Sequence, residues 1–303
     1  MTYLLTGATG FLGRPLAGRL LAEGHGVSYL GRKRSLSFDT RAAFFLWEDP
    51  ERSLPPLETV PRTDAIVHLA GEPVAQRWTA EVKRRIRSSR IAGTRNLVTA
   101  VGKLKHKPKV LVGASAVGYY GNRGDELITE ASGPGSGFLA DVCVEWEREA
   151  DRARELGLRV VHIRIGIVLG PGGGALGKML MPFQFGLGGT LGDGHQWMPW
   201  IHRDDLARMF EFVAESETAS GAWNGTAPEP VTNVVFTKTL AKVLGRPALF
   251  PAPKFAVRLA FGEMADVLFD SMRAVPAAPL NAGFSFEYSQ LESALRAVLH
   301  KAA

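Results

Sequence analysis

Three glycines near the start of the chain have the spacing of a loop that binds a diphosphate. Gly7, Gly10 and Gly13 follow a short apolar stretch, and the apolar periodicity of residues 14–23 predicts a helix directly after them. Glycines permit a tight turn, a close approach of phosphate to bare backbone and close packing of helix on strand. The helix N-terminus adds unpaired N–H groups and a positive dipole end. Because a predicted strand and helix flank the loop, we favour dinucleotide binding over an ordinary glycine-rich turn.

The residues after the second predicted strand indicate which dinucleotide is bound. This strand covers residues 25–30, and a fold that binds NAD would continue with Asp or Glu to hold the ribose 2′-hydroxyl. The chain continues instead with Gly31, Arg32, Lys33 and Arg34. A guanidinium group matches a 2′-phosphate bidentately, so the sequence predicts NADP(H). The alternative is a solvated basic loop.

Several side chains are candidates for acid–base chemistry, and each has a structural alternative. Ser115 is followed by Tyr119 and Tyr120, either of which could supply a phenol or simply pack beneath a nicotinamide ring. His195 and His202 flank two tryptophans in a glycine-rich region and are candidate acids or bases. The two aspartates after His202 are also typical of the start of a helix, one as its cap and one as a first-turn acid.

Length and cysteine content limit the class of protein. A chain of 303 residues suits one large domain, or a large domain with a small one. Cys143 is the single cysteine, which excludes an intrachain disulfide and offers no metal cluster. Its helical surroundings favour a small buried hydrophobe over a reactive thiol. We expect a cytoplasmic protein with no bound metal, no leader peptide and no membrane-spanning segment.

Basic residues outnumber acidic ones, and much of the excess is local. The net charge is +6, from 36 basic and 30 acidic residues, and residues 77–109 form a basic stripe. Nucleic acid is an unlikely partner for this stripe, because neither interleaved aromatic residues nor a known nucleic-acid motif accompanies it. We interpret most of it as a solvated helix face, with one or two arginines turned toward cofactor phosphates.

Alternating strands and helices predict the fold class. Further strands are expected at residues 42–47, 64–71, 109–115 and 158–164, and helices at residues 79–103 and 137–156. This alternation predicts an α/β Rossmann-type, doubly wound parallel sheet, with the apolar strand 64–71 at its centre. We divide the chain into a Rossmann domain, residues 1–225, and a small, mainly helical unit, residues 226–303.

The last part of the chain has a different texture. The glycine-rich residues 170–194 suit a loop near a ligand. A helix is expected from about Asp205, and the small unit is expected to contain helical segments at residues 233–244, 253–270 and 284–299.

Taken in order, these motifs resemble a known family. Thr6-Gly-Ala-Thr-Gly-Phe-Leu-Gly13, Asp64-x-x-x-His-Leu-Ala-Gly71, Gly93-Thr-x-Asn-Leu97 and Ser115-x-x-x-x-Tyr-Gly121 are similar to those of the extended short-chain dehydrogenase/reductases. That group includes the sugar-nucleotide epimerases and dehydratases. Further motifs resemble the atypical "epimerase family" subgroup, the YfcH-like proteins: Val168-Leu-Gly-Pro-Gly-Gly-Gly, Trp200-Ile-His, Asn224-Gly-Thr-Ala-Pro and Asn281-Ala-Gly-Phe. The resemblance covers essentially the whole chain.

The resemblance implies a set of cofactor-binding positions. The diphosphate is expected at Gly7, Gly10, Phe11, Leu12 and Gly13, the 2′-phosphate at Gly31 and Arg32, and the adenosine-ribose edge at Leu69, Ala70 and Gly71. Arg90 stands where ordinary members carry an Asn, three residues before a Gly-Thr pair, and is expected to reach a phosphate or ribose. Val168 is expected near the nicotinamide.

The chain departs from the family in its catalytic pair. Ordinary members transfer hydride with a Tyr-x-x-x-Lys pair and a Ser or Thr that orients the substrate. Here the candidate positions hold Phe138, Leu139, Val142 and Cys143, so neither phenol nor amine is present. Ser115 matches the family's Ser or Thr region, and Ser115, Tyr119 and His202 are the candidate catalytic residues.

Two functions remain open from the sequence. One is an NADP(H)-dependent oxidoreductase or epimerase-like enzyme for an unknown small molecule. The other is a non-catalytic, nucleotide-binding regulator that acts through a protein partner, because some relatives have been described as cell-division or plastid-division factors. The sequence fixes neither the substrate nor the oligomeric state.

Overall fold

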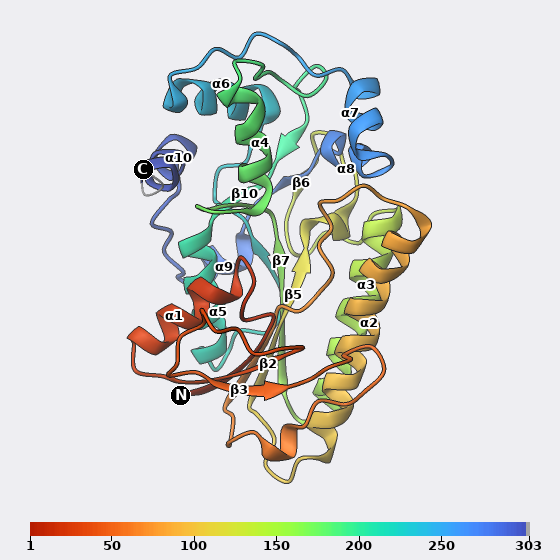
Figure 1. The fold of residues 1–303 in the computed structure, drawn as a ribbon, viewed down its shortest axis with the longest axis vertical. Coiled ribbons are helices and arrows are strands. Elements are labelled where there is room, and N and C mark those ends of the chain that lie inside the picture. The colour runs from red at the N-terminus through yellow and green to blue at the C-terminus, as the bar shows by residue number, and fades with distance from the viewer. Residues whose placement is uncertain (301–303) are drawn as a thin grey trace.

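Seven short strands form one parallel sheet in the computed structural model, which describes residues 1–300 (Figure 1). They are β1 (Thr2–Thr6), β2 (Gly26–Gly31), β3 (Ala43–Leu46), β4 (Ala65–His68), β5 (Val110–Ala116), β7 (Arg159–Ile165) and β11 (Gly221–Gly225). Their order across the sheet is β11-β7-β5-β4-β1-β2-β3, and every neighbouring pair is parallel. The predicted strand at residues 64–71 is central, as expected, but its regular part is limited to β4.

Four long helices cover the two faces of this sheet. They are α1 (Gly13–Ala22), α2 (Ala80–Lys103), α3 (Phe138–Asp151) and α5 (Arg203–Glu215). Figure 1 shows α1 and α5 on one side of the strands and α2 and α3 on the other. Leu16 of α1 and Phe210 of α5 belong to one buried cluster, whereas Leu97 of α2 and Ala150 of α3 belong to another. The predicted Rossmann-type α/β fold is therefore confirmed.

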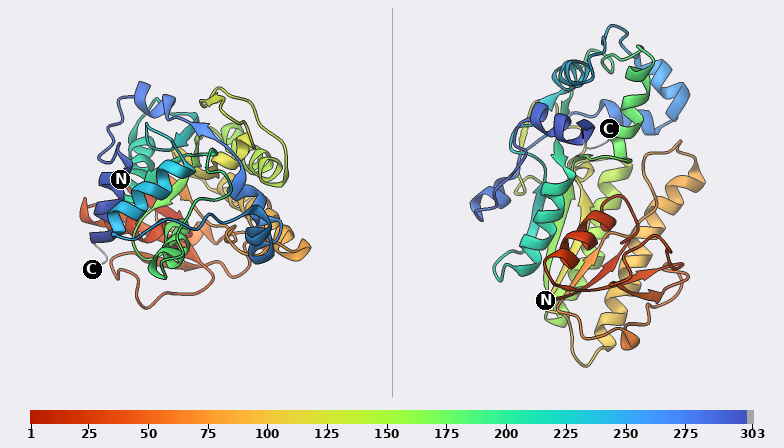
Figure 2. Two further views of the ribbon diagram at one scale, coloured as in Figure 1. Left: turned by 90° about the horizontal axis from the view of Figure 1, so that it is seen from above. Right: turned by 60° about the vertical axis from the view of Figure 1, so that its left-hand side comes forward.

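Short strands and helices lie beyond the carboxyl end of the sheet (Figures 1 and 2). The strands pair as β8 (Ile167–Leu169) with β10 (Trp200–His202), β9 (Trp197–Met198) with β12 (Val231–Thr232), and β6 (Leu127–Ile128) with β13 (Arg273–Ala274). The helices there are α4 (Gly174–Gln184), α6 (Asn233–Leu244), α7 (Lys254–Phe261), α8 (Met264–Phe269) and α10 (Leu291–His300). Helix α9 (Ala277–Asn281) lies beside the sheet instead, where Ala278 packs on the core that α1 and α5 share (Figure 1). Three short 3-10 helices, η1 (Leu57–Thr59), η2 (Val117–Tyr120) and η3 (Arg152–Leu156), complete the described elements.

Segments from both sides of residue 225 share one hydrophobic core in this upper part. Leu176 of α4 and Trp200 of β10 pack in the same buried cluster as Phe236 of α6 and Leu295 of α10. The core of the small unit is therefore built from residues 169–200 together with residues 227–298. The division of the chain at residue 225 stays a prediction.

Three segments differ from the expected elements. Residues 170–194 are not all loop, because α4 forms between the two glycine clusters. Its buried residues, Leu176 and Phe183, lie on the same face of the helix. The helix expected at residues 253–270 is divided into α7 and α8. The break is at Gly262, whose φ of +64° is incompatible with a right-handed helix. The helix expected at residues 284–299 begins only at Leu291.

None of the described helices combines the length and the apolar character that a transmembrane helix needs.

Candidate functional site

The glycine loop between β1 and α1 is packed so tightly that larger residues do not fit. Gly7 has φ +66°, and a Cβ added there would lie 2.9 Å from the backbone of Leu69 and Ala70. A Cβ on Gly13 would lie 2.3 Å from the carbonyl oxygen of Gly7, where helix and strand meet. The first turn of α1 contains no acid and has no side-chain cap, so no carboxylate competes for the positive end of the helix dipole. This bare backbone cradle fits a dinucleotide diphosphate.

A buried histidine fixes the strand end that supports the loop. His68 donates or accepts through Nδ1 to Thr6 Oγ1 at 2.7 Å and through Nε2 to Thr94 Oγ1 at 2.9 Å. The backbone N–H groups of Leu69 and Ala70 donate to the same Thr6 hydroxyl at 3.2 and 3.1 Å. Burial, with a smaller contribution from the nearby Arg90 charge, lowers the pKa of His68 to about 4. Leu69 and Ala70 are thus held against Gly7, at the edge where the sequence predicted the adenosine ribose.

Basic side chains gather at the end of β2. Gly31 ends this strand, and Arg32 follows it as an exposed side chain. Arg14 of α1 reaches the same loop, where it donates to the Ser37 carbonyl at 2.5 Å and lies 5.6 Å from the ring centroid of Phe38. The Arg14 guanidinium therefore reaches the loop after β2 from a separate element, close in the chain to Arg32, where a 2′-phosphate was expected.

Arg90 turns inward from α2 instead of joining the solvated stripe. Its guanidinium donates to the carbonyls of Glu72 and Ile86 and lies 5.0 Å from the ring centroid of Trp146. A Cβ on Gly71 would lie 3.1 Å from the Arg90 guanidinium carbon, so the two residues are in contact. Burial lowers the pKa of Arg90. This places a desolvated cation beside the predicted ribose edge.

Phe11 and Val168 have different surroundings. The glycine-rich turn before α4 packs on Phe11, because a Cβ on Gly174 would lie 2.8 Å from its ring. Arg203 lies over the other side, with its guanidinium 5.3 Å from the Phe11 ring centroid. Leu12, the residue before α1, packs on the main core. Val168 is buried in the same core, and its neighbours, residues 165–167, line the cavity described below.

A buried polar network lies behind the end of β5. The Ser115 hydroxyl donates to Glu147 Oε1 at 2.6 Å, and Arg164 donates to both oxygens of that carboxylate at 2.9 Å. Arg164 also donates to the Tyr120 hydroxyl at 3.0 Å, which in turn donates to Asn224 Oδ1 at 2.7 Å. Burial raises the pKa of Tyr120 to about 12. The Ser115 hydroxyl and the Tyr120 phenol are therefore engaged in holding β5, β7 and β11 together.

The positions of the missing catalytic pair are filled by nonpolar groups. Leu139 lines the cavity, and its side chain packs where a Cβ on Gly118 would lie 3.2 Å away. Cys143 is buried one turn further along α3. Burial, assisted by the negative charge of Glu147, raises the pKa of Cys143 to about 11, so the thiol stays protonated at neutral pH.

The other candidate acids and bases lie in structural positions. Tyr119 packs on Arg164, whose guanidinium carbon is 3.4 Å from the ring centroid. His202 is 1% exposed, stacks on Tyr288 and caps α5 by accepting from the backbone N–H of Asp204 at 3.1 Å. The expectation that an aspartate caps this helix is wrong, because the imidazole takes that place. His195 is exposed in the loop before β9 and does not line the described cavity.

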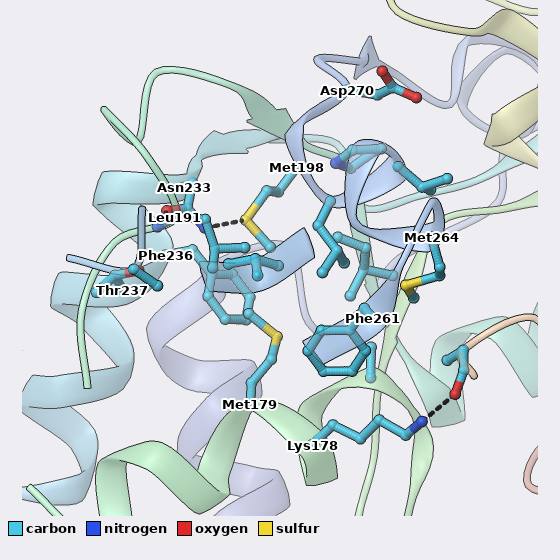
Figure 3. A pocket seen from close by; sticks show the side chains of 18 of the residues that line it. Lys178, Met179, Leu191, Met198, Asn233, Phe236, Thr237, Phe261, Met264 and Asp270 are labelled. Atoms are coloured by element: carbon cyan, nitrogen blue, oxygen red, sulfur yellow. Dashed lines mark hydrogen bonds between the residues drawn. The ribbon is translucent and has the colours of Figure 1, made fainter. Parts of the chain in front are cut away.

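A cavity of about 420 Å³ opens beside the carboxyl ends of β5 and β7 (Figure 3). Its inner end is formed by residues 116–118, residues 165–167 and Leu139, all of them nonpolar. Figure 3 shows Met179 of α4, Phe236 of α6 and Phe261 of α7 turned toward one another around the same space. The volume is typical of a site for a small molecule.

The cavity and the glycine loop share supporting elements. The first residues of α4 pack on Phe11, and later residues of the same helix, including Lys178 and Met179, line the cavity. Lys178 also donates to the carbonyl of Ala75, which follows the β4 edge and lines the cavity too. Two candidate ligand sites are therefore adjacent along one edge of the sheet.

Acidic partners accompany the basic stripe of α2. Ion pairs engage Lys83 with Glu263, Arg84 with Glu81, Arg85 with Glu72, Arg87 with Glu145, and Arg95 with Glu149. Such pairing is typical of a solvated helix face and leaves less positive charge for a polyanion.

One group in the described part of the chain has a spacing that suits a metal ion. Ligand atoms of Glu23, His25 and Glu211 lie within 4.8 Å of one another, near the opposite edge of the sheet. Arg19 forms ion pairs with both glutamates, at 2.6 Å to Glu211, so their negative charge is already balanced by a cationic side chain.

The sheet order and the glycine loop after β1 define a dinucleotide-binding Rossmann protein. A family model described as "NAD dependent epimerase/dehydratase family" matches residues 3–224, and one described as "Domain of unknown function (DUF1731)" matches residues 252–298. The chain belongs to the NAD dependent epimerase/dehydratase family.

Named relatives are similar over nearly the whole chain. The epimerase family protein YfhF of Bacillus subtilis is 39% identical over 296 residues, which cover 97% of each chain. The chloroplastic epimerase family protein SDR39U1 homolog of Arabidopsis thaliana is 39% identical over 99% of this chain and 87% of its own. The crystal structure of human epimerase family protein SDR39U1 with NADPH has a TM-score of 0.89 at 34% identity, covering 99% of both chains. The predicted resemblance is confirmed.

Sequence reasoning missed several residues of the candidate site. Arg14 and Arg203 belong to no recognisable motif. Arg14 reaches the loop after β2 from α1, and Arg203 reaches Phe11 of the glycine loop from α5, so tertiary packing alone brings them there. Glu147 and Arg164 lie 17 residues apart and meet as a buried ion pair. One signal was available in the sequence: Glu147 and Arg164 stand on the otherwise apolar faces of α3 and β7, and a buried charge needs a partner.

Proposed function

We propose that the chain binds NADPH at the glycine loop and passes hydride to a small molecule in the adjacent cavity. The single observation that carries this proposal is the cavity at the ends of β5 and β7. A protein that used the nucleotide only as a structural ligand has no need of a second site of this volume beside it.

The phosphate end of the cofactor is proposed to lie on the bare backbone of residues 7–13. Arg14 and Arg32 then face the 2′-phosphate, and the desolvated Arg90 guanidinium faces the ribose edge. When bound, NADPH supplies a hydride. The relative crystallised with NADPH supports this choice of cofactor.

A regulator without catalysis is the second candidate, and the replaced pair favours it. Leu139 and Cys143 leave this helix without the phenol and the amine that ordinary members use. Under this alternative the cavity would hold an effector or part of a protein partner, and NADPH would be bound without turnover.

Titration of the purified protein with NADPH tests the first step, with NADH as the matched control. Quenching of tryptophan fluorescence should give a Kd for NADPH at least about tenfold lower than for NADH, because only NADPH has the phosphate for Arg14 and Arg32. Equal affinities would contradict the assignment of the basic loop. Failure of both to bind would overturn the proposed function.

A further inference from the structure

The cavity has few polar groups for a hydrophilic ligand. Asn233 is 1% exposed, its Oδ1 accepts from the Leu191 N–H at 2.8 Å, and its Nδ2 donates to Met198 Sδ at 3.2 Å. The ionisable lining residues, Lys178 and Asp270, are at the periphery, and Figure 3 shows Asp270 apart from the central side chains. A sugar nucleotide would lose hydrogen bonds to water on entering and find few in return.

Exposed apolar side chains continue from the cavity to the molecular surface. Leu187 and Phe250 line the cavity and are 60% and 56% exposed. Their segments are joined by backbone hydrogen bonds, from Phe250 N to Gly188 O at 3.2 Å and from Ala252 N to Thr190 O at 2.7 Å. Phe255 on the neighbouring α7 is 76% exposed. An apolar mouth on an apolar cavity suits a ligand that is itself poorly soluble in water.

The inner end of the cavity lacks a side chain that could give up a proton. Leu139, at one of the two candidate positions for the phenol, lines this end, and the nearby Ser115 hydroxyl already donates to Glu147. The thiol of Cys143 is buried on α3 and is not among the described residues that line the cavity. The lining residues 116–118 and 165–167 carry only hydrogen or hydrocarbon side chains.

This absence selects among hydride acceptors. Reduction of a simple aldehyde or ketone leaves an alkoxide, whose basicity is close to that of hydroxide, with a conjugate-acid pKa of about 15.7, so it needs an acid within reach. Reduction of a quinone leaves a phenolate-type anion, whose conjugate-acid pKa is about 10, as for a tyrosine phenol. The second product is stable enough to wait for a proton from water.

We infer that the cavity takes an uncharged, apolar quinone as hydride acceptor. The inference rests on the proposed function and names its substrate class. The quinone accepts one hydride, with its two electrons, at a carbonyl oxygen, so the C4–H bond of the dihydronicotinamide breaks and an O–H bond forms. Its ring becomes aromatic, the negative charge rests on a phenolate oxygen, and a proton from water completes the hydroquinone. NADPH, one proton and the quinone thus give NADP⁺ and the hydroquinone.

Oxidation of NADPH by the full chain tests this inference with three acceptors of different chemistry. The probes are 2-methyl-1,4-naphthoquinone, the similarly sized ketone 1-tetralone, and UDP-4-keto-6-deoxyglucose, a sugar nucleotide with a reducible ketone. The naphthoquinone should support oxidation at least about tenfold faster than either of the others, after subtraction of the reaction without protein. A reaction that releases the hydroquinone in a 1:1 ratio to NADP⁺ would support the assigned step.

A pair of variants on α4 tests whether the reaction occurs in the cavity. Met179→Glu places a carboxylate in the wall, whereas Gln184→Glu adds the same charge to an exposed position that does not line the cavity. Met179→Glu should raise KM for the naphthoquinone at least about tenfold and leave the Kd for NADPH within about twofold. Gln184→Glu should change neither. Leu187→Glu, at the exposed mouth, gives a second test with little risk to folding.

The possible failures are distinguishable. NADPH that binds tightly but is oxidised by 1-tetralone or UDP-4-keto-6-deoxyglucose in preference to the naphthoquinone would overturn the inference and leave the proposed function intact. Tight binding of NADPH with no oxidation by any probe would overturn the inference and favour the regulator. Equal KM values for Met179→Glu and Gln184→Glu would show that the quinone reacts outside the cavity, which also overturns the inference.

Discussion

The glycine loop and the apolar cavity lie side by side but present opposite kinds of surface. The loop presents bare backbone, a left-handed turn at Gly7 and the neighbouring basic residues Arg14 and Arg32. The cavity uses hydrocarbon walls from α4, α6, α7 and α8, and its buried Asn233 is already hydrogen-bonded. The difference teaches that one edge of a sheet can carry a polar surface and an apolar cavity side by side, because different segments of the chain build the two.

The buried network behind both sites should give the largest effect on stability. Glu147→Gln leaves Arg164 without its carboxylate, and we expect a loss of about 3 to 5 kcal/mol in the free energy of unfolding. Urea denaturation measures this loss. The matched control is Glu81→Gln, which removes the exposed partner of Arg84 and should change the free energy of unfolding far less. Similar losses in the two variants would contradict the assigned role of the network.

A methyl group in the glycine loop should separate the two sites. Gly7→Ala places a Cβ 2.9 Å from the backbone of Ala70 at φ +66°, and we expect the Kd for NADPH to rise at least about 100-fold, or 2.7 kcal/mol. Binding of the naphthoquinone in the absence of NADPH should change less than about twofold. Gly18→Ala, on the exposed side of α1 with open space around it, is the control. Unchanged NADPH binding in Gly7→Ala would sink the assignment of the loop.

Loss of one cation should sharpen the description of the cofactor edge. Arg32→Ala should weaken NADPH binding about tenfold, equivalent to 1.4 kcal/mol, and leave NADH binding unchanged, because only NADPH has the 2′-phosphate. Fluorescence titration with both cofactors measures the ratio. Arg52→Ala, with a side chain that is 87% exposed in another loop, should alter neither affinity. An equal decrease for both cofactors would place Arg32 elsewhere in the site.

Acid should weaken the cofactor edge through His68. The folded-state pKa of about 4 lies below the ordinary value of 6.5, so the unfolded chain binds more protons between these values and stability falls as pH falls through this window. Wild type should therefore lose up to about 1.4 kcal/mol per pH unit more than His68→Gln. Unfolding free energies at pH 7, 6 and 5 would measure the two slopes. Parallel slopes would mean that His68 does not titrate as described.

Local sequence patterns predicted the cofactor half because its features are local. The three glycines, the helix after them and the basic residues after β2 are all set by backbone geometry and charge over a few residues. The same reasoning placed Thr79 and Ala80 at the start of α2, where the Thr79 hydroxyl accepts from the Val82 N–H. It failed at α4, because flanking glycines concealed a short amphipathic helix that is stabilised by packing against α6 and α10.

By itself the sequence determined the phosphate loop, the alternation of strands and helices, and the basic residues after β2, since each depends on neighbours in the chain. Only the tertiary structure decided that Ser115 is bound to Glu147, that His202 caps a helix, and that Leu139 faces an apolar cavity. The walls of that cavity come from residues 75 to 272. No local pattern records such a site, because its shape and polarity arise where distant segments pack together.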